Sequence, residues 1–151
     1  MATLISHSPA ETLALGEQWG RAVPSGWVIG LSGDLGAGKT QFVKGLARGL
    51  GIAARVHSPT FALVNIYSGG RLTLFHVDLY RLETPAQILA AGLEDYLTPA
   101  GVTVIEWAER WFGEAQDQPA APFLPADRFR WIQIHTLGET ARRITYEDIG
   151  S

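Results

Sequence analysis

The sequence predicts one α/β domain over residues 1–151, a P-loop NTPase-like sheet with a parallel core, added antiparallel strands and hairpins, and helices on both faces. Three observations predict it. An apolar, strand-like run at 27–31 leads directly into a glycine-rich loop and then into a segment with helical spacing at 41–50. Two further apolar runs, ending at Val77 and Ile105, each precede an acidic residue. Helical stretches separate these runs, as in layered α/β folds, and no repeat or linker divides the chain.

The composition is that of an ordinary globular protein, with 46% hydrophobic and 18% charged residues. The formal charge of −3 argues against a surface built to hold nucleic-acid phosphates. The absence of cysteine excludes disulfides, thiolate metal sites and cysteine nucleophiles. No apolar stretch reaches 18 residues, and the first residues lack the pattern of a signal peptide, so we expect a soluble, cytoplasmic protein without a membrane segment.

The first predicted element is a helix of about three turns that begins after Ser8. Ser8 can cap its N-terminus, Pro9 suits the first helical position, and Glu11 can reach back to complete a capping box. Residues 27–31 form the first predicted strand, and Gly51 stops the helix predicted over 41–50.

The rest of the chain is predicted as two hairpins that flank a helix, a strand and a proline-containing loop. In order, these are a hairpin of 61–67 with 71–77, a helix from 84 to about 97, a strand at 102–105, a loop at 113–127 and a hairpin of 129–136 with 141–146.

Residues 33–40, GDLGAGKT, match the P-loop pattern G-x-x-x-x-G-K-[ST]. Glycines let backbone N–H groups turn toward phosphate oxygens, and the following helix presents its positive N-terminal end to the same anion. Lys39 can reach the β- and γ-phosphates, and the Thr40 hydroxyl can bind Mg²⁺. A chance match in a chain of this length has odds of about one per cent. The predicted nucleotide-binding residues are Asp34, Leu35, Gly36, Ala37, Gly38, Lys39 and Thr40.

Two carboxylates compete for the acidic position that holds Mg²⁺ or orients water in a P-loop site. Asp78 and Glu106 each follow an apolar strand at its carboxyl end, where ligands of open α/β sheets bind. A solvent-facing acid is the alternative for either residue alone. His76 can act as a base, although a histidine within a strand is more often a packed or surface residue.

Three other features have a functional and a structural interpretation. Thr60, in Ser-Pro-Thr, can sense the γ-phosphate as a switch loop does, or it can belong to a plain turn. Trp107 is a partly buried aromatic beside Glu106. Arg142 and Arg143 are either solvated charges or one of them reaches the nucleotide.

The segments GDLGAGKT, SPTFALVN, HVDLYRL, AGLEDYL and VIEWAER occur in this order, and together they resemble the TsaE (YjeE) family of ATPases in tRNA threonylcarbamoyladenosine biosynthesis. HVDLYRL and VIEWAER are more specific than the P-loop. The resemblance implies a P-loop fold and slow, Mg²⁺-dependent ATP hydrolysis. It also implies TsaD and TsaB as partners, with tRNA met through their complex, which the ATPase cycle resets.

By the same resemblance, Lys39 binds phosphates, Thr40 and Glu106 hold Mg²⁺, and Asp78 supports hydrolysis through water or the metal. It further places Thr60 in a switch-like loop and lets Trp107 position the site or face the partners. Arg142 contacts the nucleotide, and the segment near Pro9 covers the adenine, each on weaker similarity. Ala62 and Ile66 depart from the family pattern, which puts details of the switch-like loop or the partner surface in doubt.

The main alternative is a small-molecule kinase, which needs a second substrate pocket and a lid with arginines over the phosphates. The stretch 83–109 is poor in arginine. A GTPase is disfavoured because Asn65, the sole asparagine, does not belong to an N-K-x-D element. A nucleotide-gated binding module with incidental hydrolysis remains open.

Overall fold

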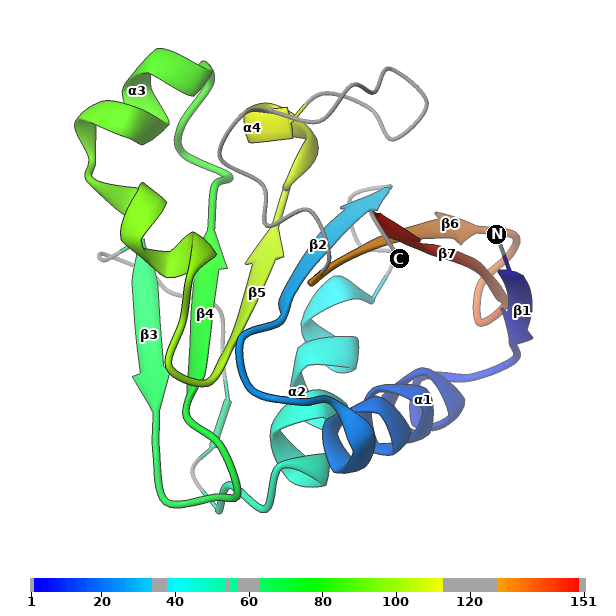
Figure 1. Cartoon of the computed structure of the whole chain (residues 1–151). Coiled ribbons are helices and arrows are strands. Elements are labelled where there is room, and N and C mark those ends of the chain that lie inside the picture. The colour runs from blue at the N-terminus through cyan, green and yellow to red at the C-terminus, as the bar shows by residue number, and fades with distance from the viewer. Residues whose placement is uncertain (1, 34–37, 54, 57–62, 113–127, 150–151) are drawn as a thin grey trace.

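The computed structural model describes residues 2–33, 38–53, 55–56, 63–112 and 128–149. Figure 1 shows a mixed sheet with helices on both sides. Its elements are β1 (Ala2–Ser6), α1 (Pro9–Ala22), β2 (Val28–Gly33), α2 (Lys39–Gly49), β3 (Val64–Tyr67), β4 (Leu74–Asp78), α3 (Pro85–Ala90), the 3₁₀ helix η1 (Leu93–Leu97), β5 (Val102–Glu106), α4 (Glu109–Phe112), β6 (Phe129–Thr136) and β7 (Arg142–Ile149).

The seven strands of the sheet follow the order β1-β7-β6-β2-β5-β4-β3. The central strands β6, β2, β5 and β4 run parallel. The strands β3, β7 and β1 are added antiparallel at the two edges. This arrangement confirms the predicted fold class and both predicted hairpins. Because β2, β4 and β5 are parallel, their carboxyl ends lie together at one end of the sheet.

The helices α1 and α2 pack together on one face of the sheet (Figure 1). Phe42 and Leu46 of α2, and Leu50 directly after it, are fully buried and pack in one core with Leu31 and Val104 of the sheet. The helical spacing of these apolar residues therefore points one side of α2 at the core. Lys39 and Thr40, the last two residues of the P-loop pattern, form the start of the same helix.

The opposite face is covered by α3, η1 and α4. Ile88, Leu97 and Trp111 of these short helices are buried against Val77 and Ile105. Both faces of the parallel strands are thus removed from water, which explains why the strand sequences are continuous apolar runs. Among the described residues, no helix is long and apolar enough to cross a membrane.

The structure corrects several predicted elements. The single helix expected from 84 to about 97 is two segments, because Gly92 adopts a left-handed backbone with φ 74° between α3 and η1. β1 and α4 were not predicted. Glu11 does not complete a capping box on Ser8, since its carboxylate accepts from the backbone N–H of His7, although Ser8 Oγ does accept from Glu11 N at 3.1 Å. The loop predicted at 113–127 lies outside the described residues.

Candidate functional site

The two ends of the P-loop join the central strand to the first turn of α2. Gly33 closes β2 with φ 131°, and a Cβ built there would lie 2.0 Å from the carbonyl oxygen of Ile134. Gly38 caps α2 in the left-handed region, with φ 99°. Both positions therefore require glycine. Residues 34–37 lie outside the described part of the chain, so their predicted phosphate contacts stay predictions.

Lys39 and Thr40 are the first two residues of α2. Lys39 is 5% exposed, and its Nζ donates to the Gly33 carbonyl at 3.1 Å. A buried ammonium is costly unless it is paired or hydrogen-bonded, and this site holds one beside the positive end of a helix. The site thus concentrates positive charge where an anion would offset it.

The two predicted carboxylates lie side by side. β4 and β5 pair in parallel, and the register places Asp78 directly opposite Glu106 at their carboxyl ends. Thr40 Oγ1 donates to Glu106 Oε1 at 3.3 Å, which joins the start of α2 to the end of β5. The structure therefore brings Thr40, Asp78 and Glu106 together, as the positions of the acids at strand ends predicted.

Asp78 has a raised pKa, chiefly because burial penalises its charged form. The hydrogen bond from the backbone N–H of Tyr80, at 3.0 Å, favours the carboxylate, whereas the nearby Glu106 disfavours it. His76 and Lys39 favour the charged form more weakly. Two carboxylates at paired positions would attract a cation, and a bound cation would favour the charged form of Asp78.

Trp107 covers Lys39. The Lys39 Nζ lies 4.2 Å from the centroid of the Trp107 ring, and Trp107 is the one non-glycine residue of the described chain with positive φ, at 62°. Such backbone strain clusters at functional sites. Tyr80 and Arg110 support the indole, with ring centroids 5.3 Å apart and the guanidinium carbon 5.1 Å from the Trp107 ring. The geometry agrees with the predicted positioning role of Trp107, which stays a prediction.

Arg142 is placed at the same end of the sheet as Gly33, at the start of β7. Its Nη1 donates to the carbonyls of Gly138 and Ala141, each at 2.9 Å, within the closing hairpin. The predicted nucleotide contact of Arg142 stays a prediction. Thr60 and Ala62 lie outside the described residues, while Ile66 is exposed on the edge strand β3.

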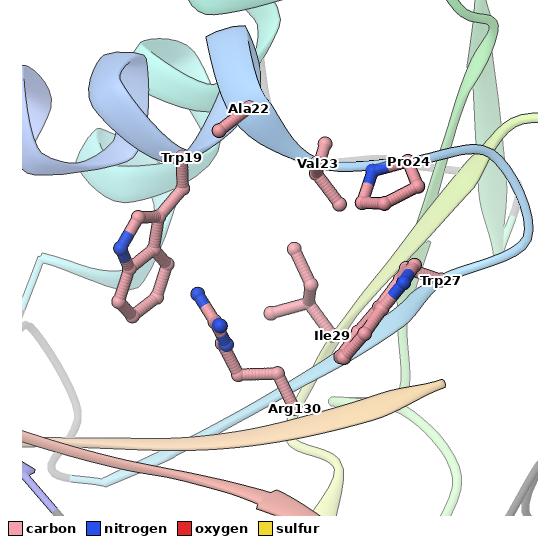
Figure 2. Close-up of a pocket in the computed structure, with 7 residues that line it drawn as sticks. All are labelled: Trp19, Ala22, Val23, Pro24, Trp27, Ile29 and Arg130. Atoms are coloured by element: carbon pink, nitrogen blue, oxygen red, sulfur yellow. The ribbon is translucent and has the colours of Figure 1, made fainter. Parts of the chain in front are cut away.

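A separate pocket lies where β2 begins, at the end of the sheet away from the P-loop. Figure 2 shows the side chains of Trp19 and Trp27 on either side of the Arg130 guanidinium. Arg130 donates to both carboxylate oxygens of Asp148, at 2.5 and 3.0 Å, and its guanidinium carbon lies 4.5 Å from the Trp19 ring. The other lining residues are Ala22, Val23, Pro24 and Ile29. Of the predicted site residues that the structure describes, none lines this pocket.

Sequence reasoning underrated His76 and missed the supporting roles of Tyr80 and Arg110. His76 is fully buried, and its Nε2 lies 2.5 Å from Glu106 Oε2. One signal was available, because a histidine in the middle of an apolar strand must find a polar partner. Arg110 Nη1 donates to the carbonyl oxygens of Tyr80 and Leu82, and no local pattern signals such a contact.

Known proteins resemble this chain along most of its length. The family model described as "Threonylcarbamoyl adenosine biosynthesis protein TsaE" matches residues 6–144. The tRNA threonylcarbamoyladenosine biosynthesis protein TsaE of Bacillus subtilis is 40% identical over 144 residues, which cover 95% of this chain and 84% of that protein. The protein of the same name from Treponema pallidum is 47% identical over 141 residues, which cover 93% and 96%.

The crystal structure of Bacillus subtilis YdiB superposes with a TM-score of 0.76 at 35% identity, covering 99% of this chain and 86% of that one. Similarity of this extent includes the P-loop helix, both acidic strand ends and the closing hairpin, so it concerns the whole described fold. The chain therefore belongs to the TsaE family of threonylcarbamoyl adenosine biosynthesis proteins.

Proposed function

We propose that this protein is a Mg²⁺-dependent ATP hydrolase that serves tRNA threonylcarbamoyladenosine modification by resetting a TsaD–TsaB transfer complex between turnovers. The convergence of Lys39 and Thr40 with Asp78 and Glu106 carries the enzymatic part of the proposal. Membership of the TsaE family carries the pathway. The partners TsaD and TsaB, and contact with tRNA through their complex, follow from the resemblance of the motifs.

Mg²⁺ fits the donor set at this site. Thr40 and Glu106 offer a hydroxyl and a carboxylate whose oxygens are 3.3 Å apart, and Asp78 adds a second carboxylate beside them. Mg²⁺ prefers oxygen ligands, and it is usually held by one or two carboxylates together with phosphates and water. We assign Thr40 and Glu106 as its protein ligands. When bound, the ion neutralises charge on the phosphates during phosphoryl transfer.

The remaining residues have distinct roles in this proposal. Lys39 balances negative charge on the β- and γ-phosphates, because it is the buried cation at the start of α2. Asp78, with its raised pKa, accepts a hydrogen bond from the attacking water and orients it. Trp107 keeps the Lys39 ammonium close to the carboxylates and shields it from water.

The substitution Lys39→Ala tests the phosphate site. Removing a charge-assisted hydrogen bond costs roughly 1.5–3 kcal/mol, so we expect ATP affinity or turnover to fall by about 10- to 100-fold. Lys44→Ala is the matched control, because Lys44 is the chain's other lysine and is exposed on the same helix. Equal ATP affinity and turnover in Lys39→Ala and wild type would refute the site assignment.

The substitutions Asp78→Asn and Glu106→Gln test the acidic pair. Each removes a charge with little change in shape, so we expect both variants to bind nucleotide and to lose Mg²⁺-dependent hydrolysis. Asp95→Asn serves as a control, since Asp95 is exposed on η1. Hydrolysis at the wild-type rate in both variants would show that the carboxylate roles are wrong.

Reconstitution with TsaD, TsaB and tRNA tests the pathway. We expect the wild-type protein with ATP to support many rounds of adenosine modification for each transfer complex, and Glu106→Gln to support no more than the reaction without it. Multiple turnovers that are independent of this protein, where an established family member is required, would count against the assignment.

A further inference from the structure

The buried histidine behind the acidic pair is a polar group to which the proposed mechanism gives no role. His76 lies in the middle of β4, opposite Val104 of β5, and its side chain is fully buried. In parallel strands it shares a face with Asp78 and sits diagonally across from Glu106. A polar ring at such a position costs folding free energy unless it is hydrogen-bonded, so a side chain that needs no partner would serve packing better.

The hydrogen bonding of His76 specifies one form of its ring. Its Nε2 lies 2.5 Å from Glu106 Oε2, while its Nδ1 is buried without a partner in the part of the chain that the structure describes. An ionised carboxylate can only accept, so Nε2 carries the proton. A second proton on Nδ1 would place an unsatisfied N–H in the core. The geometry therefore assigns Nε2 as the ring atom that donates to Glu106.

The two oxygens of Glu106 are consequently held from different sides. Oε2 accepts from His76, and Oε1 accepts from Thr40 at the start of the P-loop helix. A carboxylate with a single partner can rotate about its last side-chain bond, whereas two donors define its plane. With Oε2 held from behind by His76, Oε1 is left facing Thr40 and a ligand on that side.

We propose that His76 is a positioning residue that holds Glu106 with Oε1 directed at Thr40 and the Mg²⁺·nucleotide. This inference rests on the proposed function for its catalytic consequence. The outer partners of metal-binding carboxylates are worth about 10- to 100-fold in metal affinity or activity.

Two substitutions separate positioning from packing. His76→Leu removes the donor and keeps an apolar side chain, whereas His76→Gln offers an N–H group that can replace Nε2–H. With ATP and Mg²⁺ in the whole 151-residue chain, we expect His76→Leu to lower kcat by about 10- to 100-fold, and His76→Gln to recover most of that loss. We expect nucleotide affinity measured without Mg²⁺ to stay at the wild-type value, because the hydrogen bond of His76 is to Glu106 and, within the described part of the site, not to Lys39 or Thr40.

A double-substitution cycle shows whether His76 acts through Glu106. The cycle is read as the Mg²⁺ affinity of the nucleotide-bound protein, because Glu106→Gln is expected to lose hydrolysis. In a Glu106→Gln background, adding His76→Leu should change that affinity by less than about 2-fold, whereas in the wild-type background it should weaken it by about 10- to 100-fold, since interacting residues are not additive. Equal effects of His76→Leu in both backgrounds would overturn the inference, and so would a wild-type kcat in folded His76→Leu.

A measurement without nucleotide tests the hydrogen bond itself. In ¹H–¹⁵N long-range spectra of the free protein, we expect His76 to carry its proton on Nε2, and Glu106→Gln to move that ¹⁵N resonance. A proton on Nδ1 alone would overturn the inference, even if His76→Leu failed to fold. If the wild type shows no Mg²⁺-dependent turnover, the proposed function fails together with the catalytic consequence of His76. If the wild type is active and His76→Leu hydrolyses ATP at the same rate, the positioning role of His76 is refuted and the proposed function stands.

Discussion

Alanine in place of Gly45 tests the packing that holds the P-loop helix in position. Four glycines, at 16, 20, 45 and 49, let α1 and α2 meet backbone to backbone. A Cβ at Gly45 would lie 1.9 Å from the carbonyl oxygen of Leu13 and 3.0 Å from the backbone nitrogen of Glu17. Ordinary contact begins at 3.4 Å, so the helices must separate by about 1.5 Å. A gap of 0.5–1 Å already forfeits roughly a quarter to a half of the dispersion attraction.

These distances set the magnitude. Overpacking of this kind costs about 1–3 kcal/mol and occasionally more, and the obstructing atoms are backbone, so the upper end applies. Alanine returns about 1 kcal/mol through its higher helix propensity. We therefore expect Gly45→Ala to lower the free energy of unfolding by about 2 kcal/mol, which corresponds to roughly 4–8 °C in Tm for a chain of this size.

Thermal unfolding followed by circular dichroism measures this effect. Gly138→Ala is the control, because a Cβ at Gly138 meets nothing within 4 Å and its backbone lies outside the left-handed region. We expect that variant to stay within about 0.5 kcal/mol of wild type. A Tm of Gly45→Ala at or above the wild-type value would refute the close helix contact.

Three further predictions concern stability. Burial holds the pKa of Asp78 above its ordinary value of 3.8, so ionising it costs folding free energy. Asp78→Asn should therefore raise Tm at pH 7, and the gain should shrink as the pH falls through the raised pKa; a lower Tm at pH 7 contradicts this. Arg130→Lys keeps the charge but loses the bidentate hydrogen bond to Asp148, so it should lower the free energy of unfolding measured in urea by about 1 kcal/mol. An unchanged urea midpoint would show that the pair does not stabilise the fold. Thr84→Ala removes the hydroxyl that accepts from Gln87 N at the start of α3, and it should lower the free energy of unfolding by about 1 kcal/mol, whereas Thr84→Ser keeps the hydroxyl and should retain the stability. Equal rates of amide hydrogen exchange in α3 of the alanine and serine variants would argue against the cap.

Local features of the chain were predictable because their causes are local. The P-loop pattern, the apolar runs of β2 and β5, the cap at Ser8 and the start of a helix near Thr84 each depend on residues within a few positions of one another. Boundaries were less predictable. The helix expected near 84–97 ends early because the backbone of Gly92 turns left-handed, and periodicity does not report that turn.

The meeting of side chains far apart in sequence was predictable only in outline. Acids at two strand ends could be expected at one edge of a parallel sheet, but their pairing depends on strand order and register. Asp78 faces Glu106 because β4 lies beside β5 in one particular register. A shift of one residue would have turned one of the two side chains to the opposite face of the sheet.

The sequence by itself determined the P-loop pattern, the parallel α/β fold class and the resemblance to the TsaE family, since each depends on residues close together in the chain. Tertiary structure alone decided that His76 bonds Glu106 across 30 residues, that Thr40 reaches Glu106 across 66, and that α1 lies close enough to α2 to demand glycine at their contact. These contacts arise from packing two helices on a registered sheet, and the free energy that selects them is shared among many residues rather than carried by any one segment.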